Sequence, residues 1–436
     1  MSARRPATGH RIRAESWTVH PGAALSTSTA ALLLALPPAA SAQQALRDSI
    51  AGEQAVAARK ATMENQPYTY KAGDFRLLTS ASLGAEYNDD VTLSNGAPED
   101  DFILKPLLDL SASYPITSWN LLKLQLGVGY DCYLQHSDLD ALRLNSGSEL
   151  SFDVYVKDIW INLHDRFSYS QNSGTEAAVA LSGRYGGLDN TPGLTTTWDL
   201  QDLVLTLGYD HENFLSSASE FEYLDRASEL LLARAGFRVH PKLTTGLEAT
   251  GSFTSYDQPV LNDSTSYSAG LFADWQPGPY FRVQPRAGYT FYLFDQTSRV
   301  IRAVDQDAWY ADLTVTHAIT ETISYSISAG HELRLGIQAD SIEDTYIRPA
   351  VHWAAMKRLN VTASFSYENG TQGNSGSAGG LHETYDWFSA GLGLSHHLTD
   401  KLMVSLDYRY TYRTSDAASR DYTQNLVTLR ATYSFQ

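Results

Sequence analysis

The chain has 436 residues, of which 19% are charged, with 26 tyrosines, 30 glycines, one cysteine and a net charge of −17. The single cysteine, Cys132, excludes a disulfide framework within the chain, and the acidity argues against nucleic acid as a partner. A composition rich in aromatic residues and poor in charge and thiols is typical of an all-β protein.

The first 42 residues have the pattern of a secretory signal. Four arginines within the first 13 residues precede the apolar run "ALLLALPPAASA", which is too short to cross a bilayer and ends in an A-x-A cleavage site. A short N-terminal membrane anchor is the alternative, and the length and the small-residue site disfavour it. We therefore predict that residues 1–42 are removed, which leaves 28 basic against 48 acidic residues and a net charge of −20.

Residues 43–74 differ in composition from everything that follows. They are rich in alanine, and Leu46, Ile50 and Val56 lie at loosely helical spacing ahead of Pro67. This pattern predicts a short helix and then a linker, a solvated periplasmic leader before the main domain. A plug or a partner-binding helix is the alternative for the same residues.

From Phe75 to the C-terminus, apolar residues alternate with polar ones. The segments "LLKLQLGVGYDCYLQ", "SELSFDVYVKD" and the terminal "NLVTLRATYSFQ" each place their apolar side chains on one face of an extended strand. Such segments have the length that a tilted strand needs to cross a bilayer. No apolar run in this part of the chain reaches the length of a membrane-spanning helix. Residues 75–436 are therefore predicted to form an outer-membrane β-barrel.

The connections between these segments alternate in length. Short ones such as "VKD" and "AITET" alternate with long polar ones such as "NDDVTLSNGAPEDD", which is typical of an antiparallel up-and-down transmembrane β-barrel. Counting the segments predicts about eighteen strands, with the short connections periplasmic. The last strand should pair with the first, near "FRLLTSASLGAEYND", because an open edge in lipid leaves backbone groups without partners. A soluble β-sandwich or propeller would have shorter strands and no such alternation.

Several segments resemble an outer-membrane β-barrel porin family that is often found with exopolysaccharide and exosortase-type systems of Gram-negative bacteria. They are "KAGDFRLLTSASLGAEYNDDVTLS", "DDFILKPLLDLSASY", "DLVLTLGYDHENF" and "RDYTQNLVTLRATYSF", and the resemblance covers residues 70–435. It implies a cell outer-membrane location and a link to surface polysaccharide. It implies no catalytic or binding residues.

Charged residues occupy many positions between the apolar ones, and we predict that they line the barrel interior. An Arg or Lys facing the middle of the bilayer costs about 2–4 kcal/mol, so these positions indicate which face is inward. The predicted pore-lining residues are Arg166, Arg234, Arg282, Arg286, Arg334, Arg348, Arg409, Arg430, Asp131, Asp153, Asp210 and Glu248. Ion pairing that fills the barrel and a water-filled channel are both open interpretations; the strand number favours the channel.

The connection "NSGTEAAVALSGRYGGLDNTPG" is predicted to fold inward as a constriction loop. It contains the small apolar run Ala177 to Leu181, which gains nothing on an exposed surface, and its glycines permit tight bends. Glu176 and Arg184 are its candidate functional residues, with Arg184 expected to pair with carboxylates on the barrel wall. A surface loop is the alternative.

No metal site, cofactor or enzyme motif is predicted. The acidic loop around residues 88–101 has oxygen ligands but matches no calcium-loop spacing, so a solvated acidic surface is the preferred interpretation. His211, between Asp210 and Glu212, is the only local acid-base cluster, and a polar rim residue explains it.

The predicted function is transport: a porin-like channel for small hydrophilic solutes, or a barrel that assists surface-polysaccharide export. The alternatives are a closed structural or interaction barrel with acidic loops and, less favoured, a barrel enzyme. The expected partners are outer-membrane lipid, the barrel-assembly machinery, and small solutes or polysaccharide.

Overall fold

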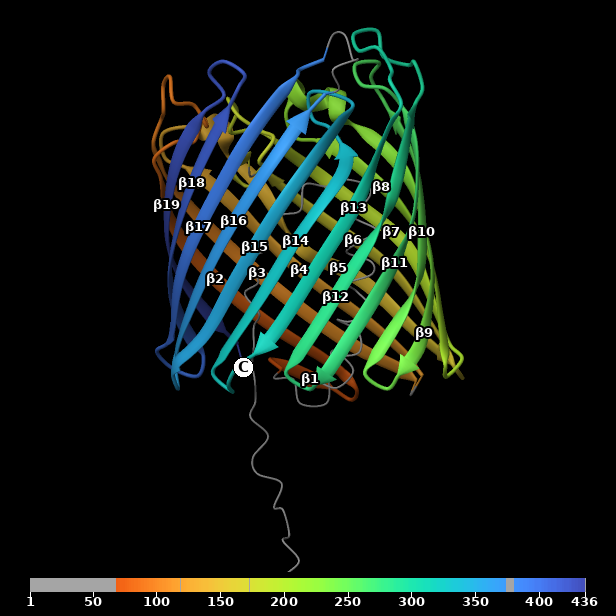
Figure 1. The fold of residues 1–436 in the computed structure, drawn as a ribbon. Helices are drawn as coiled ribbons and strands as arrows, with labels where there is room; N and C mark the ends of the chain where they lie inside the picture. Colours follow the sequence, from red (N-terminus) through yellow and green to blue (C-terminus); the bar gives the residue numbers. More distant parts are fainter. Residues whose placement is uncertain (1–67, 118, 172, 374–379, 436) are drawn as a thin grey trace, which may run out of the picture.

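Eighteen strands in the described part of the chain follow one another around a closed antiparallel barrel (Figure 1). This computed structural model describes residues 68–435 except 118, 172 and 374–379. The strands are β2 (Phe75–Asn88), β3 (Asp101–Thr117), β4 (Asn120–Tyr133), β5 (Ala141–Val156), β6 (Ile159–Gln171), β7 (Gly186–Asp199), β8 (Leu203–Ser216), β9 (Arg226–His240), β10 (Leu243–Tyr256), β11 (Ser264–Gly278), β12 (Phe281–Phe294), β13 (Gln306–Ala318), β14 (Ile323–Leu335), β15 (Ser341–Met356), β16 (Leu359–Gln372), β17 (Glu383–His397), β18 (Leu402–Ser415) and β19 (Tyr422–Ser434).

The last strand closes the barrel against the first, as the sequence predicts. β19 pairs with β18 on one side and with β2 on the other, from Leu426↔Asn88 to Ser434↔Ser80. This closure provides a neighbour for both edges of the sheet, which a barrel surrounded by hydrocarbon requires. The predicted all-β fold, antiparallel order and eighteen strands are confirmed.

Short and long connections gather at opposite ends of the barrel. The connections at one end, here called the turn end, have two to four residues, as in 157–158 between β5 and β6. Those at the other, the loop end, have five to 14 residues and include the short 3-10 helices η2 (Ser137–Leu139), η3 (Ser173–Thr175) and η4 (Ser219–Leu224). In Figure 1 the turn end lies at the bottom, beside the C-terminus.

Alternation along each strand separates an apolar outer face from a polar inner face. On β12, Tyr289, Phe291 and Leu293 are exposed on the outside, while Arg282 and Arg286 point inward. The alternation of apolar and polar residues in the sequence therefore corresponds to the outer and inner faces of the wall. Within the described residues, no helix is long and apolar enough to cross a membrane.

The segment before the barrel contributes one short strand. β1 (Tyr70–Ala72) turns back at Gly73, which has a positive φ of 61°, and pairs with the start of β2. The predicted signal peptide, residues 1–42, and the predicted leader helix lie outside the described residues, so both stay predictions.

The predicted constriction loop is shorter than its sequence indicates, because β7 begins at Gly186. The stretch "GGLDNTPG" has the composition of a loop, yet it pairs with β6 along its whole length. Its pairing with β8 skips Thr191 and Pro192, and the proline has no N–H to donate. The loop itself therefore spans residues 172–185.

Candidate functional site

On the inner face of β9 to β16, cations and carboxylates alternate. Arg286 lies 3.0 Å from Asp312 and 3.9 Å from Glu248, and Arg234 lies 3.6 Å from Glu248. Farther round the wall, Arg348 pairs with Glu368 at 3.1 Å. These contacts link strands that are consecutive or next but one in the barrel, and we call this band of compensated charge the lumen belt.

Three wall tyrosines, on β13, β15 and β17, donate hydrogen bonds to carboxylates of the lumen belt. The bonds are Tyr310 to Glu248 (3.0 Å), Tyr346 to Asp312 (2.7 Å) and Tyr385 to Glu368 (3.1 Å). Glycine permits this arrangement: a side chain at Gly370 would collide with the ring of Tyr385, which crosses the neighbouring strand there. The sequence analysis did not identify these tyrosines. A glycine at an inward-facing position of the preceding strand could have indicated them, because it leaves room for the tyrosine ring.

The opposite wall, β4 to β8, carries a buried polar chain. Asp131 pairs with Arg143 at 2.7 Å. Lys123 pairs with Asp153 at 2.5 Å, and Asn162 donates to the second oxygen of Asp153 and contacts the Nδ1 of His164. The Nε2 of His164 then lies 3.0 Å from Asp210, which also faces Arg166 at 3.5 Å.

The remaining predicted pore-lining residues lie apart from these groups. Arg282 pairs with Asp274 near the turn end, where its Nε donates a bond of 2.8 Å. Arg409 and Arg430 point inward on β18 and β19, and neither forms an ion pair with another described residue. Arg334 belongs to the loop-end contacts described next.

The loop between β6 and β7 crosses the lumen to the far wall. From Ser173 to Leu181 it reaches β14–β18, which lie on the opposite side of the barrel. Arg413 donates to the carbonyl oxygen of Ala177 (2.7 Å) and Arg420 to that of Ala178 (2.8 Å). Glu176 accepts from Arg334 at 3.2 Å. This part of the chain therefore connects the two walls at the loop end.

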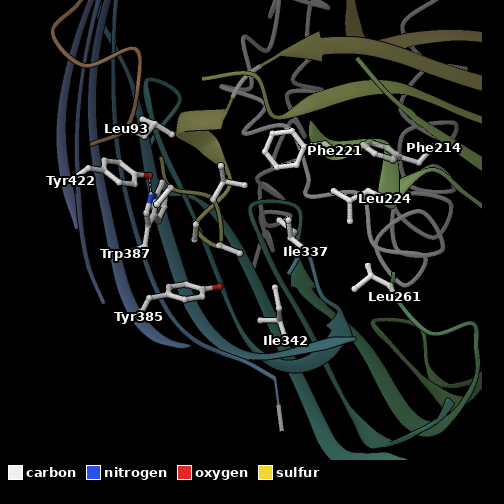
Figure 2. Packing of buried hydrophobic residues seen from close by; sticks show 14 of the residues in the cluster. Leu93, Phe214, Phe221, Leu224, Leu261, Ile337, Ile342, Tyr385, Trp387 and Tyr422 are labelled. Atoms are coloured by element: carbon white, nitrogen blue, oxygen red, sulfur yellow. Dashed lines mark hydrogen bonds between the residues drawn. The ribbon is translucent and has the colours of Figure 1, made fainter. Parts of the chain in front are cut away.

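Ala177, Ala178, Val179 and Ala180 are buried in an apolar cluster inside the barrel. Figure 2 shows the cluster, to which inward-folded loops and wall strands contribute; Trp387 donates to the hydroxyl of Tyr422 at 3.2 Å within it. The other members are Leu93, Phe214, Phe221, Leu224, Tyr256, Leu261, Ile301, Ile337, Ile342 and Tyr385. We call this set the loop-end core.

The two candidate residues of the loop have different surroundings. Glu176 is buried between Arg334 and the loop-end core, where burial raises the pKa of its carboxyl while Arg334 opposes that rise. Arg334 also pairs with Asp344 at 2.6 Å and Glu368 at 3.4 Å. Arg184, by contrast, lies after the point at which the chain turns back from the lumen. Its side chain therefore pairs with Asp138 in a neighbouring loop. The barrel-wall partner expected for Arg184 is thus replaced by a loop carboxylate.

The acidic loop 88–101 divides into two parts: Glu99 and Asp100 are exposed, whereas Asp90 and Asp101 are buried and accept internal hydrogen bonds. Asp90 is buried and accepts from the backbone N–H groups of Thr92 and Ser94, and burial raises its pKa to about 6. Asp101 accepts from three backbone N–H groups of the next loop and from the ring of His136. These groups tie the loop in place. Among the described residues, no three His, Cys, Asp or Glu side chains are placed to hold a metal ion.

The acid-base cluster considered at His211 is divided by strand alternation. Asp210 and Glu212 are buried on the inner face, whereas the His211 ring contacts Glu229 at 2.9 Å on the outer face. Adjacent residues on a strand point to opposite sides, so the three side chains do not meet. The buried His164 has both ring nitrogens engaged, by Asn162 and Asp210.

A family model described as "Putative beta-barrel porin 2" matches residues 65–435. The solved structures similar to this chain include three from Pseudomonas aeruginosa. OccK2 (OpdF) in complex with glucuronate has 9% identity and a TM-score of 0.48, over 83% of this chain and 99% of that chain. OpdL has 14% identity and a TM-score of 0.46, over 84% of this chain and 100% of that chain. OpdK with vanillate has 10% identity and a TM-score of 0.44, over 82% of this chain and 98% of that chain. No curated protein matches the chain.

Proposed function

This chain belongs to the porin family described as "Putative beta-barrel porin 2", an outer-membrane β-barrel family, and on that premise we propose that it is a passive channel for small hydrophilic solutes. In this proposal the long loops face the cell exterior. The path runs along the inward charged residues, with the lumen belt on one wall and the Asp153–Asp210 chain on the other. An interior of both charge signs suits small polar solutes, since it offers donors and acceptors throughout.

The observation that carries the proposal is the loop across the lumen. Hydrogen bonds to Ala177 and Ala178 and the Glu176–Arg334 pair anchor it to the opposite wall. We propose that this loop sets the narrowest point of the path, and that the buried Glu176–Arg334 pair holds it there. Arg184, paired with Asp138 away from the wall, serves to hold neighbouring loops together.

A closed structural barrel is the second candidate, because the loop-end core packs apolar side chains inside the same end of the barrel. Conductance separates the two: a channel conducts ions in a planar bilayer, and a closed barrel does not. Assistance to polysaccharide export, which the sequence resemblance implied, remains a prediction. We propose no enzymatic activity, since the histidine clusters considered above serve structural contacts.

The test shortens the loop. Replacing Glu176–Leu181 by two glycines removes the groups that reach Arg334, Arg413 and Arg420. We expect single-channel conductance to rise by about twofold or more, because the cross-section at a constriction limits ion flow, and we expect larger sugars to pass. The wall should remain assembled, since no strand residue is changed, and heat-modifiable migration on a gel checks this.

Arg184→Ala is the matched control, because it changes the same loop outside the lumen. It should assemble and conduct like the unaltered protein. Unchanged conductance in an assembled shortened variant would show that the loop does not limit the path. No conductance in any of the three proteins would favour the closed barrel.

A further inference from the structure

One junction of the wall, between β13 and β14, pairs over only part of its length. Its pairs run from Ala318↔Ser324 to Ala311↔His331 and end there. β13 continues to pair with β12 as far as Gln306, and β14 continues to pair with β15 as far as Leu335. The sheet therefore separates between these strands toward the loop end.

The tip of β14 bends into the barrel at this separation. Side chains alternate along a strand, and His331 of β14 lies on the outer face. Leu333 and Leu335 should therefore also face outward, yet their exposed fractions are only 3% and 5%. They pack against inward-facing residues of β12 and β13 in a second apolar cluster. This cluster, here called the seam, consists of Tyr292, Phe294, Ala308, Leu333 and Leu335.

The seam lies at the loop-end margin of the apolar outer surface, where Asp307 and Glu343 also face outward. Trp309, on the outer face of the separated part of β13, is exposed and stacks on His331 of β14, with ring centroids 4.0 Å apart. On the neighbouring β12, Tyr289, Phe291 and Leu293 are also exposed on the outer face. In an outer-membrane protein the medium beside such a surface is lipid. A strand edge left unpaired in hydrocarbon costs several kcal/mol for each backbone group, so a wall without a role for the gap would be expected to close it.

We propose that the seam is a lateral opening that admits the acyl chain of an outer-membrane lipid between β13 and β14. The apolar seam residues match a hydrocarbon chain, and the separation is continuous with the lipid-facing surface around Trp309. Movement of the β14 tip away from β13 opens the seam, because the packing of the seam residues and the Trp309–His331 stack, rather than strand pairing, hold the two strands together there. This inference rests on the outer-membrane location and is independent of the channel proposal.

The experiment uses the full chain in bilayers of phosphatidylglycerol with a photoreactive diazirine in the acyl chain. After irradiation, mass spectrometry locates the labelled residues. The outward-facing Leu313 reports direct lipid contact. If the seam is open about a tenth of the time, label at Leu333 and Leu335 should reach about a tenth of that at Leu313. Absence of label at both seam leucines in the unaltered protein would overturn the proposal.

A disulfide lock sharpens the result. In a Cys132→Ser background, the substitutions Ala308→Cys and Leu333→Cys allow a disulfide between the two sides of the seam. With this disulfide formed, labelling of Leu335 should fall by about tenfold, and reduction should restore it. Labelling of Leu313 should not change. The matched control joins Ala233 and Ala249, which face each other across the fully paired β9–β10 junction, and should change neither label. Equal labelling of Leu335 in the locked and reduced forms would contradict a lateral opening.

Discussion

The two ends of the barrel share one wall but differ in what the connections do. At the turn end, connections of two to four residues only reverse the chain, and the Arg238–Asp199 pair there is 40% and 48% exposed. At the loop end, longer connections return into the lumen, and the Arg413–Glu383 pair is 0% exposed on both sides. A barrel wall cannot form a conventional core, because alternate side chains face outward. Long loops supply the missing core inside one end.

The largest expected effect comes from breaking the wall itself. Deleting the last six residues, "ATYSFQ", removes the pairs that Ala431–Tyr433 make with β18 and those that Ala431–Ser434 make with β2. The exposed edges would each leave unpaired backbone groups in lipid, at several kcal/mol per group, so we expect no assembled barrel. Heat-modifiable migration checks assembly. Normal migration of the truncated protein would mean that closure tolerates a shortened terminal strand.

An intermediate effect is expected from the buried ion pair at the loop end. Arg413→Leu leaves Glu383 buried with one fewer partner and removes the bond to the Ala177 carbonyl, so we expect a loss of about 3–5 kcal/mol at that end. Limited proteolysis of the loops in the assembled barrel measures it. Arg238→Leu is the turn-end counterpart and should cost about 1 kcal/mol or less, because its pair is exposed. Equal protease sensitivity of the two variants would remove the distinction between the ends.

The smallest expected effect concerns pH at the loop end. The hydrogen bond to Asp101 is the main influence that raises the pKa of His136 above its ordinary value of 6.5. The stabilisation is complete below pH 6.5 and is lost as the pH rises through the raised pKa. Because the ring is partly exposed, the change should be about 1 kcal/mol or less.

Protease cleavage within loop 134–140, followed across this pH range, measures the effect: cleavage should accelerate at alkaline pH. His136→Gln should remove that part of the pH dependence. The substitution does not alter the pH-dependent contribution of Asp90, whose pKa is raised to about 6. The difference in cleavage rate between the unaltered protein and His136→Gln therefore reports the histidine alone. A pH profile unchanged by the substitution would show that His136 does not hold the loops.

Local patterns in the amino-acid sequence were enough to predict the barrel wall. Alternation of apolar and polar residues is a property of each strand alone, since neighbouring side chains point to opposite faces whatever the strand packs against. Connection lengths then predicted the strand number and the pairing of "NLVTLRATYSFQ" with the first strand. The same alternation placed Arg286 and Asp210 on the inner face. It could not detect β7 near Gly186, where a loop-like composition forms a strand because both neighbours supply pairing.

Which charged side chains meet depends on the folded barrel. Glu176 and Arg334 are 158 residues apart and lie in contact because the loop crosses the lumen, whereas Arg184, eight residues farther along the chain, pairs with Asp138. The tyrosine–carboxylate bonds of the lumen belt and the separation at the seam likewise depend on strand register. Register and loop path are set by the closure of the whole barrel, and no local segment of the sequence contains that information.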